Sequence, residues 1–349
     1  MPQPFTSIEQ FRKQFNQGLE ALLTNHQPGT FILCLANAMQ DSELFEQLKN
    51  SLFKQHASLI GEYINKSAGD QLQNVAQEDL IVLEKIFQAG IENIELTKVR
   101  AEFPWTCQFN QLRAFRPKRI TAFNFNGDIS NAFDETQFHF NKPFLRSECF
   151  WHGNLNGKKI DLLYNKYPFA DLHGLLVPER EACLPQLLTK EMHEYIWSLN
   201  SEFKDALPGI GFGYNSYGAY ASVNHLHFQM YVDAKKLPIA LPEWKHNGGN
   251  ENYPVTLFKH TDISASWELI ENLHKLKQPY NLLYNADEIY VIPRKPQGEV
   301  TLPEWTSGFT WYELSGALLM FSADDYHNIG KASITELLSA HSVEEKLFS

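Results

Sequence analysis

With 349 residues, 43% of them hydrophobic and 13% aromatic, the chain can bury a large core and is long enough for two packed units. Thirty basic against forty-one acidic residues give a formal charge of −11, which argues against a nucleic-acid polymer as a partner. The four cysteines stand singly, and no apolar run approaches the ~20 residues of a membrane helix. We therefore expect a cytoplasmic protein without a zinc knuckle, a disulfide framework or a membrane contact.

The first hundred residues are expected to be helical. Ser7 precedes an amphipathic run that extends to Phe15, and residues 41–48 and 76–87 repeat the helical spacing of apolar side chains. No catalytic constellation stands out in residues 1–100, so we predict a helical region with a packing or regulatory role.

From about Phe103 the chain changes to short apolar runs, aromatic residues and turn residues, which are typical of antiparallel sheets. Residues 159–165 and 172–178 predict a strand pair, and an amphipathic helix is expected to follow Thr189 as far as Phe203. Further along, the pattern predicts a strand at 255–259, a helix near 266–274, and strands at 280–284 and 288–293.

One short motif occurs twice. Leu-Leu-Tyr-Asn at residues 162–165 returns at 282–285, and each copy is followed by an apolar strand that ends in proline. Two copies of one unit would make a pseudo-symmetric chain, although a match of four residues can arise by chance. The second copy continues into a strand-like run at 311–321, which contains no histidine, so we expect one active site. The expected divisions are a helical region at 1–100, a catalytic half at 101–250, a degenerate half at 251–330 and a C-terminal tail at 331–349.

The most informative stretch is residues 211–232, in which a Gly/Ser/Asn loop leads into alternating polar and apolar residues. His225, His227 and Gln229 alternate with large apolar side chains, so a strand would place all three on one face. Such a face could be inert, could bind a metal through its imidazoles, or could present a nucleophile. A metal would need further ligands, and the nearest carboxylate is Asp233, beyond the apolar end of the stretch.

This order of features resembles the histidine triad (HIT) superfamily, and within it the transferase and phosphorylase branch, in which Gln takes the third place of the motif. The run Gly-Tyr-Asn-Ser-x-Gly-Ala-aromatic-x-x-x-Asn-His-Leu-His-Phe-Gln, from Gly213 to Gln229, is similar to the GDP-L-galactose and GDP-D-glucose phosphorylases. Residues 108–119, 137–142 and 171–178 carry further similarities in the same order. The resemblance covers roughly residues 105–327. It implies an α+β fold of HIT-like antiparallel sheets with helices, arranged as two tandem halves of which the second is degenerate.

The resemblance also implies roles for individual residues. His227 would attack the α-phosphorus of a nucleoside-diphosphate sugar, GDP-hexose being favoured, and form a nucleotidyl-histidine that inorganic phosphate then cleaves. Its other ring N–H would need a fixed acceptor such as a backbone carbonyl. His225 would orient the site, and Gln229 would donate an N–H to a phosphate oxygen, since an amide cannot activate water as a base. The phosphate pocket would be lined by Asn215, Ser216, Gly218, Ser222, Asn224, Arg113 and Arg116.

Several expectations accompany this assignment. Lys118 and Arg119 belong to the same basic cluster, where a solvated patch is an equal alternative, and His173 is expected to make a structural hydrogen bond. No cofactor is implied beyond inorganic phosphate as co-substrate, and no metal, because the Cys-x-x-Cys zinc site of some uridylyltransferases is missing. The alternative enzyme is a dinucleoside polyphosphate phosphorylase of the Ap4A type. The alternatives of another class are a silent nucleotide sensor and a His-based metal site.

Overall fold

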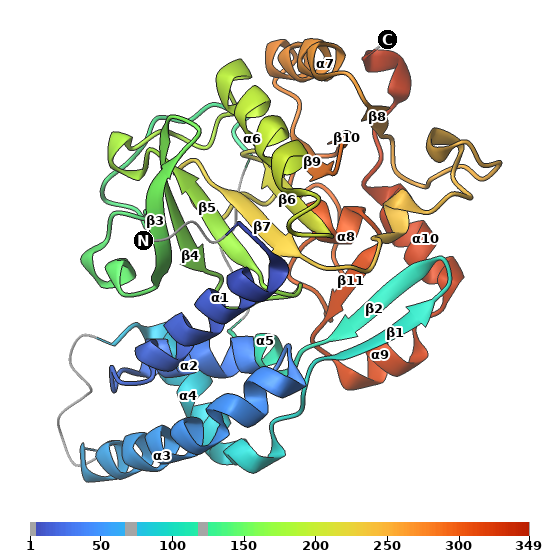
Figure 1. Cartoon of the computed structure of the whole chain (residues 1–349). Coiled ribbons are helices and arrows are strands. Elements are labelled where there is room, and N and C mark those ends of the chain that lie inside the picture. The colour runs from blue at the N-terminus through green and yellow to red at the C-terminus, as the bar shows by residue number, and fades with distance from the viewer. Residues whose placement is uncertain (1–4, 67–74, 118–124, 349) are drawn as a thin grey trace.

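The computed structural model describes residues 5–66, 75–117 and 125–348, and Figure 1 shows helices at the N-terminal end of the chain and sheets in the remainder. The helices are α1 (Ile8–Leu22), α2 (Pro28–Ala38), α3 (Ser42–Lys66), α4 (Gln77–Ala89), α5 (Gln111–Phe115), α6 (Lys190–Phe203), α7 (Ile263–Lys275), α8 (Trp311–Leu314), α9 (Ala323–Asn328) and α10 (Lys331–Ala340). The strands are β1 (Lys98–Glu102), β2 (Trp105–Phe109), β3 (Cys149–Leu155), β4 (Lys158–Tyr164), β5 (Gly174–Pro178), β6 (Ile210–Asn215), β7 (Phe228–Val232), β8 (Phe258–His260), β9 (Tyr280–Asn285), β10 (Glu288–Pro293) and β11 (Ala317–Met320). None of the described helices is both long and apolar enough to cross a membrane.

The N-terminal helices that the sequence predicts are present, and they pack directly on the sheet. The hydroxyl of Ser7 caps α1 by accepting a hydrogen bond from a backbone N–H of the first turn. The buried face of α1 then reaches the outer strands, where the ring of Phe15 lies 4.8 Å from that of Tyr164 in β4. The guanidinium of Arg12 bridges Asp41 at 2.6 Å and Asp171 at 2.7 Å. Helices and sheet therefore share one hydrophobic core, and the division that we expect at residue 100 falls within β1.

An eight-stranded antiparallel sheet forms the centre of the molecule, in the order β3-β4-β5-β7-β6-β9-β10-β8. The expected strand pair is confirmed as β4 and β5, with Leu162 opposite Leu176. The expected helix after Thr189 is confirmed as α6, whose first turn is capped by the Thr189 hydroxyl. Helix α6 packs on β6 and β9 and α7 packs on β10, so these helices cover one face (Figure 1).

Six strands of the sheet are arranged symmetrically about the β6–β9 pair. Outward from this pair the order is β6, β7, β5 on one side, with β4 and β3 beyond, and β9, β10, β8 on the other. Gly213 pairs with Leu283 at the middle of β6 and β9, so Asn215 and Asn285, each two residues further on, occupy equivalent positions. The two Leu-Leu-Tyr-Asn copies lie at the ends of β4 and β9, which this arrangement does not relate to one another.

A second sheet has three strands in the order β1-β2-β11. Strands β1 and β2 precede the strands of the large sheet in the sequence, and β11 follows them. Residues 311–321, expected as one strand, begin instead with the short helix α8 and form β11 only from Ala317. A capping box explains the helical turn: Glu313 accepts from the N–H of Thr310 at 2.8 Å, and the Thr310 hydroxyl accepts from a backbone N–H. Beyond residue 330, α10 buries Ile334 and Leu338 against this sheet's core.

Candidate active site

The two histidines of the motif lie just before β7 rather than within it, since the strand begins at Phe228. The side chain of Gln186 holds this segment in place of a paired strand: its Oε1 accepts from the N–H of His227 at 2.9 Å. Its Nε2 donates to the carbonyls of Asn215 at 3.0 Å and of His227 at 3.2 Å. Our sequence analysis did not identify Gln186, which lies in an irregular segment where no periodicity marks it.

The ring of His227 is held in one tautomer. Its Nδ1 lies 2.8 Å from the carbonyl oxygen of His225, and because a carbonyl only accepts, the proton is on Nδ1 and the lone pair on Nε2. Burial lowers the pKa of His227 to about 4. The imidazole is therefore neutral at pH 7, with one nitrogen free to act as a nucleophile.

His225 is buried and faces the segment at residues 133–142. Its Nδ1 accepts a hydrogen bond from the backbone N–H of Phe140 at 3.2 Å, so its proton is on Nε2, which is buried without a partner among the described residues. Burial, and secondarily the neighbouring His227, lower the pKa of His225 to about 4. Phe133 packs edge-on against the His225 ring, with the centroids 5.3 Å apart. The ring of His225 thus links the motif to a neighbouring segment, and His225 contacts the His227 ring through its backbone carbonyl.

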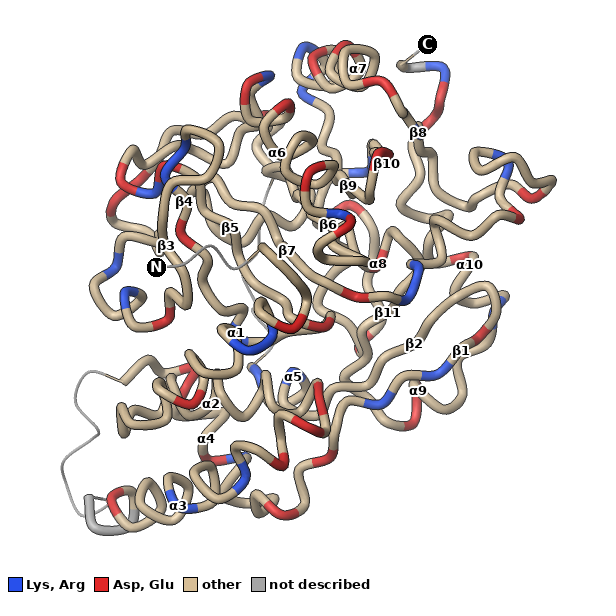
Figure 2. The backbone as a smooth tube through the Cα atoms, in the orientation of Figure 1, with Lys and Arg blue, Asp and Glu red and all other residues tan. Residues whose placement is uncertain are grey.

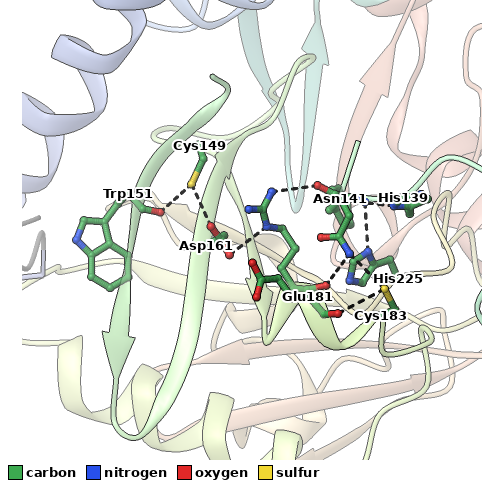
Figure 3. A network of polar contacts seen from close by, with 10 residues as sticks. His139, Asn141, Cys149, Trp151, Asp161, Glu181, Cys183 and His225 are labelled. Carbon is green, nitrogen blue, oxygen red and sulfur yellow. Dashed lines mark hydrogen bonds and ion pairs between the residues drawn. The ribbon is translucent and has the colours of Figure 1, made fainter. Parts of the chain in front are cut away.

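The segment at residues 133–142 packs against the two histidines and is hydrogen-bonded to Arg180 near its C-terminal end. The ring of Phe140 lies 5.1 Å from that of His227, and the Phe140 carbonyl accepts from Arg180 Nη1 at 3.2 Å. Arg180 Nε also donates to Asp161 at 3.2 Å, and Asn141 Nδ2 donates to the Arg180 carbonyl at 3.1 Å (Figure 3). The similarity that the sequence shows at residues 137–142 therefore falls beside the histidine motif.

Gln229 lies in β7 on the strand register shared by Gly213 of β6 and Leu175 of β5. Its Oε1 accepts a hydrogen bond from the indole N–H of Trp311 at 2.9 Å. The indole crosses the sheet directly over Gly213, where an added Cβ would overlap the ring, and it stacks on Tyr231 with the centroids 5.4 Å apart. Trp311 comes from helix α8, so a residue outside the motif, from the second half of the chain, contacts Gln229.

Replacing Gly213 by alanine is expected to displace Trp311. Because the ring is fully buried, the overlap cannot be relieved without moving the indole or the strand, and overpacking of this kind costs about 1–3 kcal/mol. We expect the thermal midpoint to fall by several degrees and the fluorescence of the buried tryptophans to change. Gly153→Ala is no suitable comparison because it too meets a tryptophan, whereas Gly61→Ala, with open space around it, serves as the control. An unchanged midpoint for Gly213→Ala would contradict this packing.

The loop residues expected to line a phosphate pocket lie near the motif, and most of their described hydrogen bonds hold the loop itself. Asn215 Oδ1 accepts from Asn281 Nδ2 at 2.6 Å and from the Trp311 backbone N–H at 3.0 Å. Ser216 Oγ accepts from a backbone N–H of β9 at 2.9 Å. Asn224 ties the motif to Gln186 and to the backbone of residues 131–132. Gly218 has a positive φ of 80° and Ser222 is exposed. Phosphate contact by these residues stays a prediction.

The described hydrogen bonds of the two arginines do not reach His227. Arg113 Nη1 donates to the Tyr167 carbonyl at 2.6 Å, and its guanidinium lies 5.4 Å from the Phe169 ring. Arg116 pairs with Glu78 at 2.9 Å. Burial lowers the pKa of Arg113 to about 10, so it keeps its charge at pH 7.

The remaining expectations concern Lys118 and Arg119, His173 and a metal site. Lys118 and Arg119 lie outside the described residues. His173 accepts a hydrogen bond from the Phe169 N–H at 3.3 Å, as a structural histidine would. Figure 2 shows acidic and basic positions interspersed along the chain. Among the described residues, no three His, Cys, Asp or Glu side chains are grouped closely enough to hold a metal ion.

Comparison with known families gives this geometry a context. Residues 79–231, from within α4 to the end of β7, match the family described as GDPGP1-like, N-terminal domain. This domain contains His225, His227 and Gln229, whereas Trp311 lies outside it.

Curated relatives of the chain include animal and plant phosphorylases. The chain is 31% identical over 158 residues to GDP-D-glucose phosphorylase 1 of Danio rerio and 40% identical over 192 residues to that of Xenopus laevis. These matches cover 44% and 43% of this chain, and 43% and 46% of the relatives, so the chain spans less than half the length of these animal proteins. GDP-L-galactose phosphorylase 2 of Arabidopsis thaliana is 24% identical, over 82% of this chain and 77% of that protein.

Among solved structures, yeast Ap4A phosphorylase Apa2 resembles the chain with a TM-score of 0.50 and 15% identity. The match covers 77% of this chain and 95% of that protein. It confirms the expected fold class, an α+β architecture of HIT-like antiparallel sheets with N-terminal helices, and it extends past the GDPGP1-like domain into the second half of the sheet.

Proposed function

We propose that the chain is a nucleotidyltransferase that cleaves a GDP-hexose with inorganic phosphate through a covalent intermediate on His227. The observation that carries the proposal is the hydrogen bond from His227 Nδ1 to the His225 carbonyl, which leaves Nε2 unprotonated in a buried site. The names of the animal and plant relatives support the GDP-hexose, and the GDPGP1-like domain contains all three motif residues.

The proposed reaction has two displacements at the same phosphorus. His227 Nε2 attacks the α-phosphorus of the GDP-hexose, the bond from that phosphorus to the bridging oxygen breaks, and hexose 1-phosphate leaves with the electron pair. An oxygen of inorganic phosphate then attacks the guanylyl-histidine and releases His227 as GDP forms. Gln229 donates its amide N–H to a non-bridging oxygen of the transferred phosphate, and the loop residues Asn215 and Ser216 shape the pocket.

The remaining expected contacts belong to the same proposal. In this proposal Gly218, Ser222 and Asn224 line the approach to the motif, and Arg113 and Arg116 counter phosphate charge. We assign the protein to the cytoplasm, which the four free cysteines support, and we expect no nucleic-acid or membrane partner.

The proposal is tested by incubating the protein with GDP-glucose, UDP-glucose and diadenosine tetraphosphate, each with and without inorganic phosphate. We expect phosphate-dependent release of GDP and glucose 1-phosphate from GDP-glucose, with the other two substrates turned over more slowly. Faster release of ADP and ATP from diadenosine tetraphosphate would favour the alternative enzyme. Nucleotide binding without turnover of any substrate would indicate a sensor, and loss of activity on removal of a stoichiometric metal would indicate the metal site.

A further inference from the structure

We propose that Trp311, which lies outside the GDPGP1-like domain, is a positioning residue that fixes the side-chain amide of Gln229 for nucleotidyl transfer. The inference rests on the proposed function, because it concerns the phosphate contact assigned to Gln229. The two residues are 82 positions apart in the chain, and the second half of the chain, from which Trp311 comes, has no His-x-His-x-Gln motif of its own.

The indole decides which way the Gln229 amide faces. An indole N–H only donates, and of the two ends of a glutamine amide only the oxygen accepts. The 2.9 Å contact from Trp311 Nε1 to Gln229 Oε1 therefore turns the NH2 group away from the indole. Within the described residues no hydrogen-bond acceptor takes that NH2 group, so it is available to a ligand oxygen.

Trp311 is itself held rigidly. Its backbone N–H donates to Asn215 Oδ1 at 3.0 Å. Its ring packs over the backbone of Gly213 and stacks on the ring of Tyr231, with 15° between the ring planes. The capping box of Thr310 and Glu313 fixes the start of α8 from which it projects. A donor that is already immobile orients the amide at no further cost when the transition state forms.

The opposite amide orientation would be unproductive. If the Gln229 oxygen faced the transferred phosphate, it would meet phosphate oxygens that also only accept. Without the indole N–H the amide loses the hydrogen bond that selects the productive orientation, about 1 kcal/mol. Two equally populated orientations lower the rate about twofold, and a side chain that rotates freely lowers it up to about fivefold. Removing the amide altogether is expected to cost about 100-fold or more, as for other donors to developing phosphate or oxyanion charge.

The experiment is a double-mutant cycle on the first displacement. Wild type, Trp311→Phe, Gln229→Ala and the double variant are mixed with GDP-glucose in the absence of phosphate, and the rate of guanylyl adduct formation is followed by rapid quenching and intact mass. We expect Trp311→Phe to be about two- to fivefold slower in the wild-type background and to have no further effect in the Gln229→Ala background. Trp105→Phe is the matched control, since Trp105 is buried, stacks on Trp244 and donates its indole N–H to Thr335 at 3.2 Å.

The outcomes separate the two proposals. An equal slowing by Trp311→Phe in both backgrounds, an equal slowing by Trp105→Phe, or no slowing at all would overturn the positioning role while leaving the proposed function intact. A wild-type protein that forms no adduct would overturn the proposed function and with it the role of Gln229. If Trp311→Phe does not fold, Gln229→Glu decides the question: it retains an acceptor for the indole but offers the phosphate no donor. We expect it to be at least as slow as Gln229→Ala, and wild-type speed would contradict the inference.

Discussion

Replacement of His227 by alanine is expected to abolish adduct formation, with a loss of turnover on the order of 10⁴-fold or more. The reason is that His227 alone among the described histidines donates its Nδ1–H to a backbone carbonyl of the motif, that of His225, and is also two residues from Gln229. Intact mass after mixing with GDP-glucose measures the adduct, and release of GDP with phosphate measures turnover.

Two comparisons give this experiment its specificity. His152→Ala removes an exposed imidazole from β3 and is expected to label like wild type. His225→Ala retains the backbone carbonyl that holds His227 but removes the acceptor for the Phe140 N–H, so we expect a slower reaction with the adduct still formed. A guanylyl adduct of normal yield on the His227→Ala protein would place the nucleophile elsewhere.

Acid is expected to destabilise the fold steeply between pH 7 and pH 5. Burial lowers the pKa of five buried histidines: His173 to about 3, and His193, His225, His227 and His341 to about 4. An unfolded histidine titrates near 6.5, so below that pH the unfolded chain binds protons that the folded chain does not. Stability is therefore complete above about pH 6.5 and is lost as the pH falls toward 4.

The expected loss is large compared with the stability of a typical domain. Each such histidine contributes about 1.4 kcal/mol per pH unit in this window, and buried carboxyls such as Glu148, whose pKa burial raises to about 7, act in the opposite direction. We expect a net loss on the order of 5 kcal/mol between pH 7 and pH 5, measured by urea unfolding, against a total stability of about 5–15 kcal/mol. His341→Gln should reduce the slope by roughly one proton, and a slope unaffected by that change would contradict the assignment.

The sequence predicts those parts of the molecule in which local pattern and tertiary structure agree. Helix α6 follows its Thr189 cap, and β4 and β5 pair as their alternation predicts. The prediction for the motif differs from the structure in one respect, since His225 and His227 precede the strand. The side chain of Gln186 makes the hydrogen bonds that a neighbouring strand would otherwise supply. Residues 311–314 form a helical turn for a similar reason, since the local capping box outweighs the strand-like composition.

What the sequence could not predict depends on contacts between distant segments. The Leu-Leu-Tyr-Asn copies have the same sequence, but the strand order gives Asn285 a position equivalent to that of Asn215. The role of Trp311 likewise has no local signal, because it is defined only by the glycine beneath it and the amide beside it. Gly213 is needed because a larger residue there would overlap the indole, and this reason becomes visible only when the position of Trp311 is known.

The central β6–β9 pair also determines what counts as the smallest working piece of this protein. The GDPGP1-like domain ends at residue 231, yet its strand β6 has β9 as its second neighbour. A fragment cut at the family boundary would turn an interior strand into a bare edge, with a row of unpaired N–H and C=O groups along it. The end of the family match at residue 231 is thus a boundary of shared sequence only. The sheet that holds the histidine motif continues past it, through the pairing of β6 with β9.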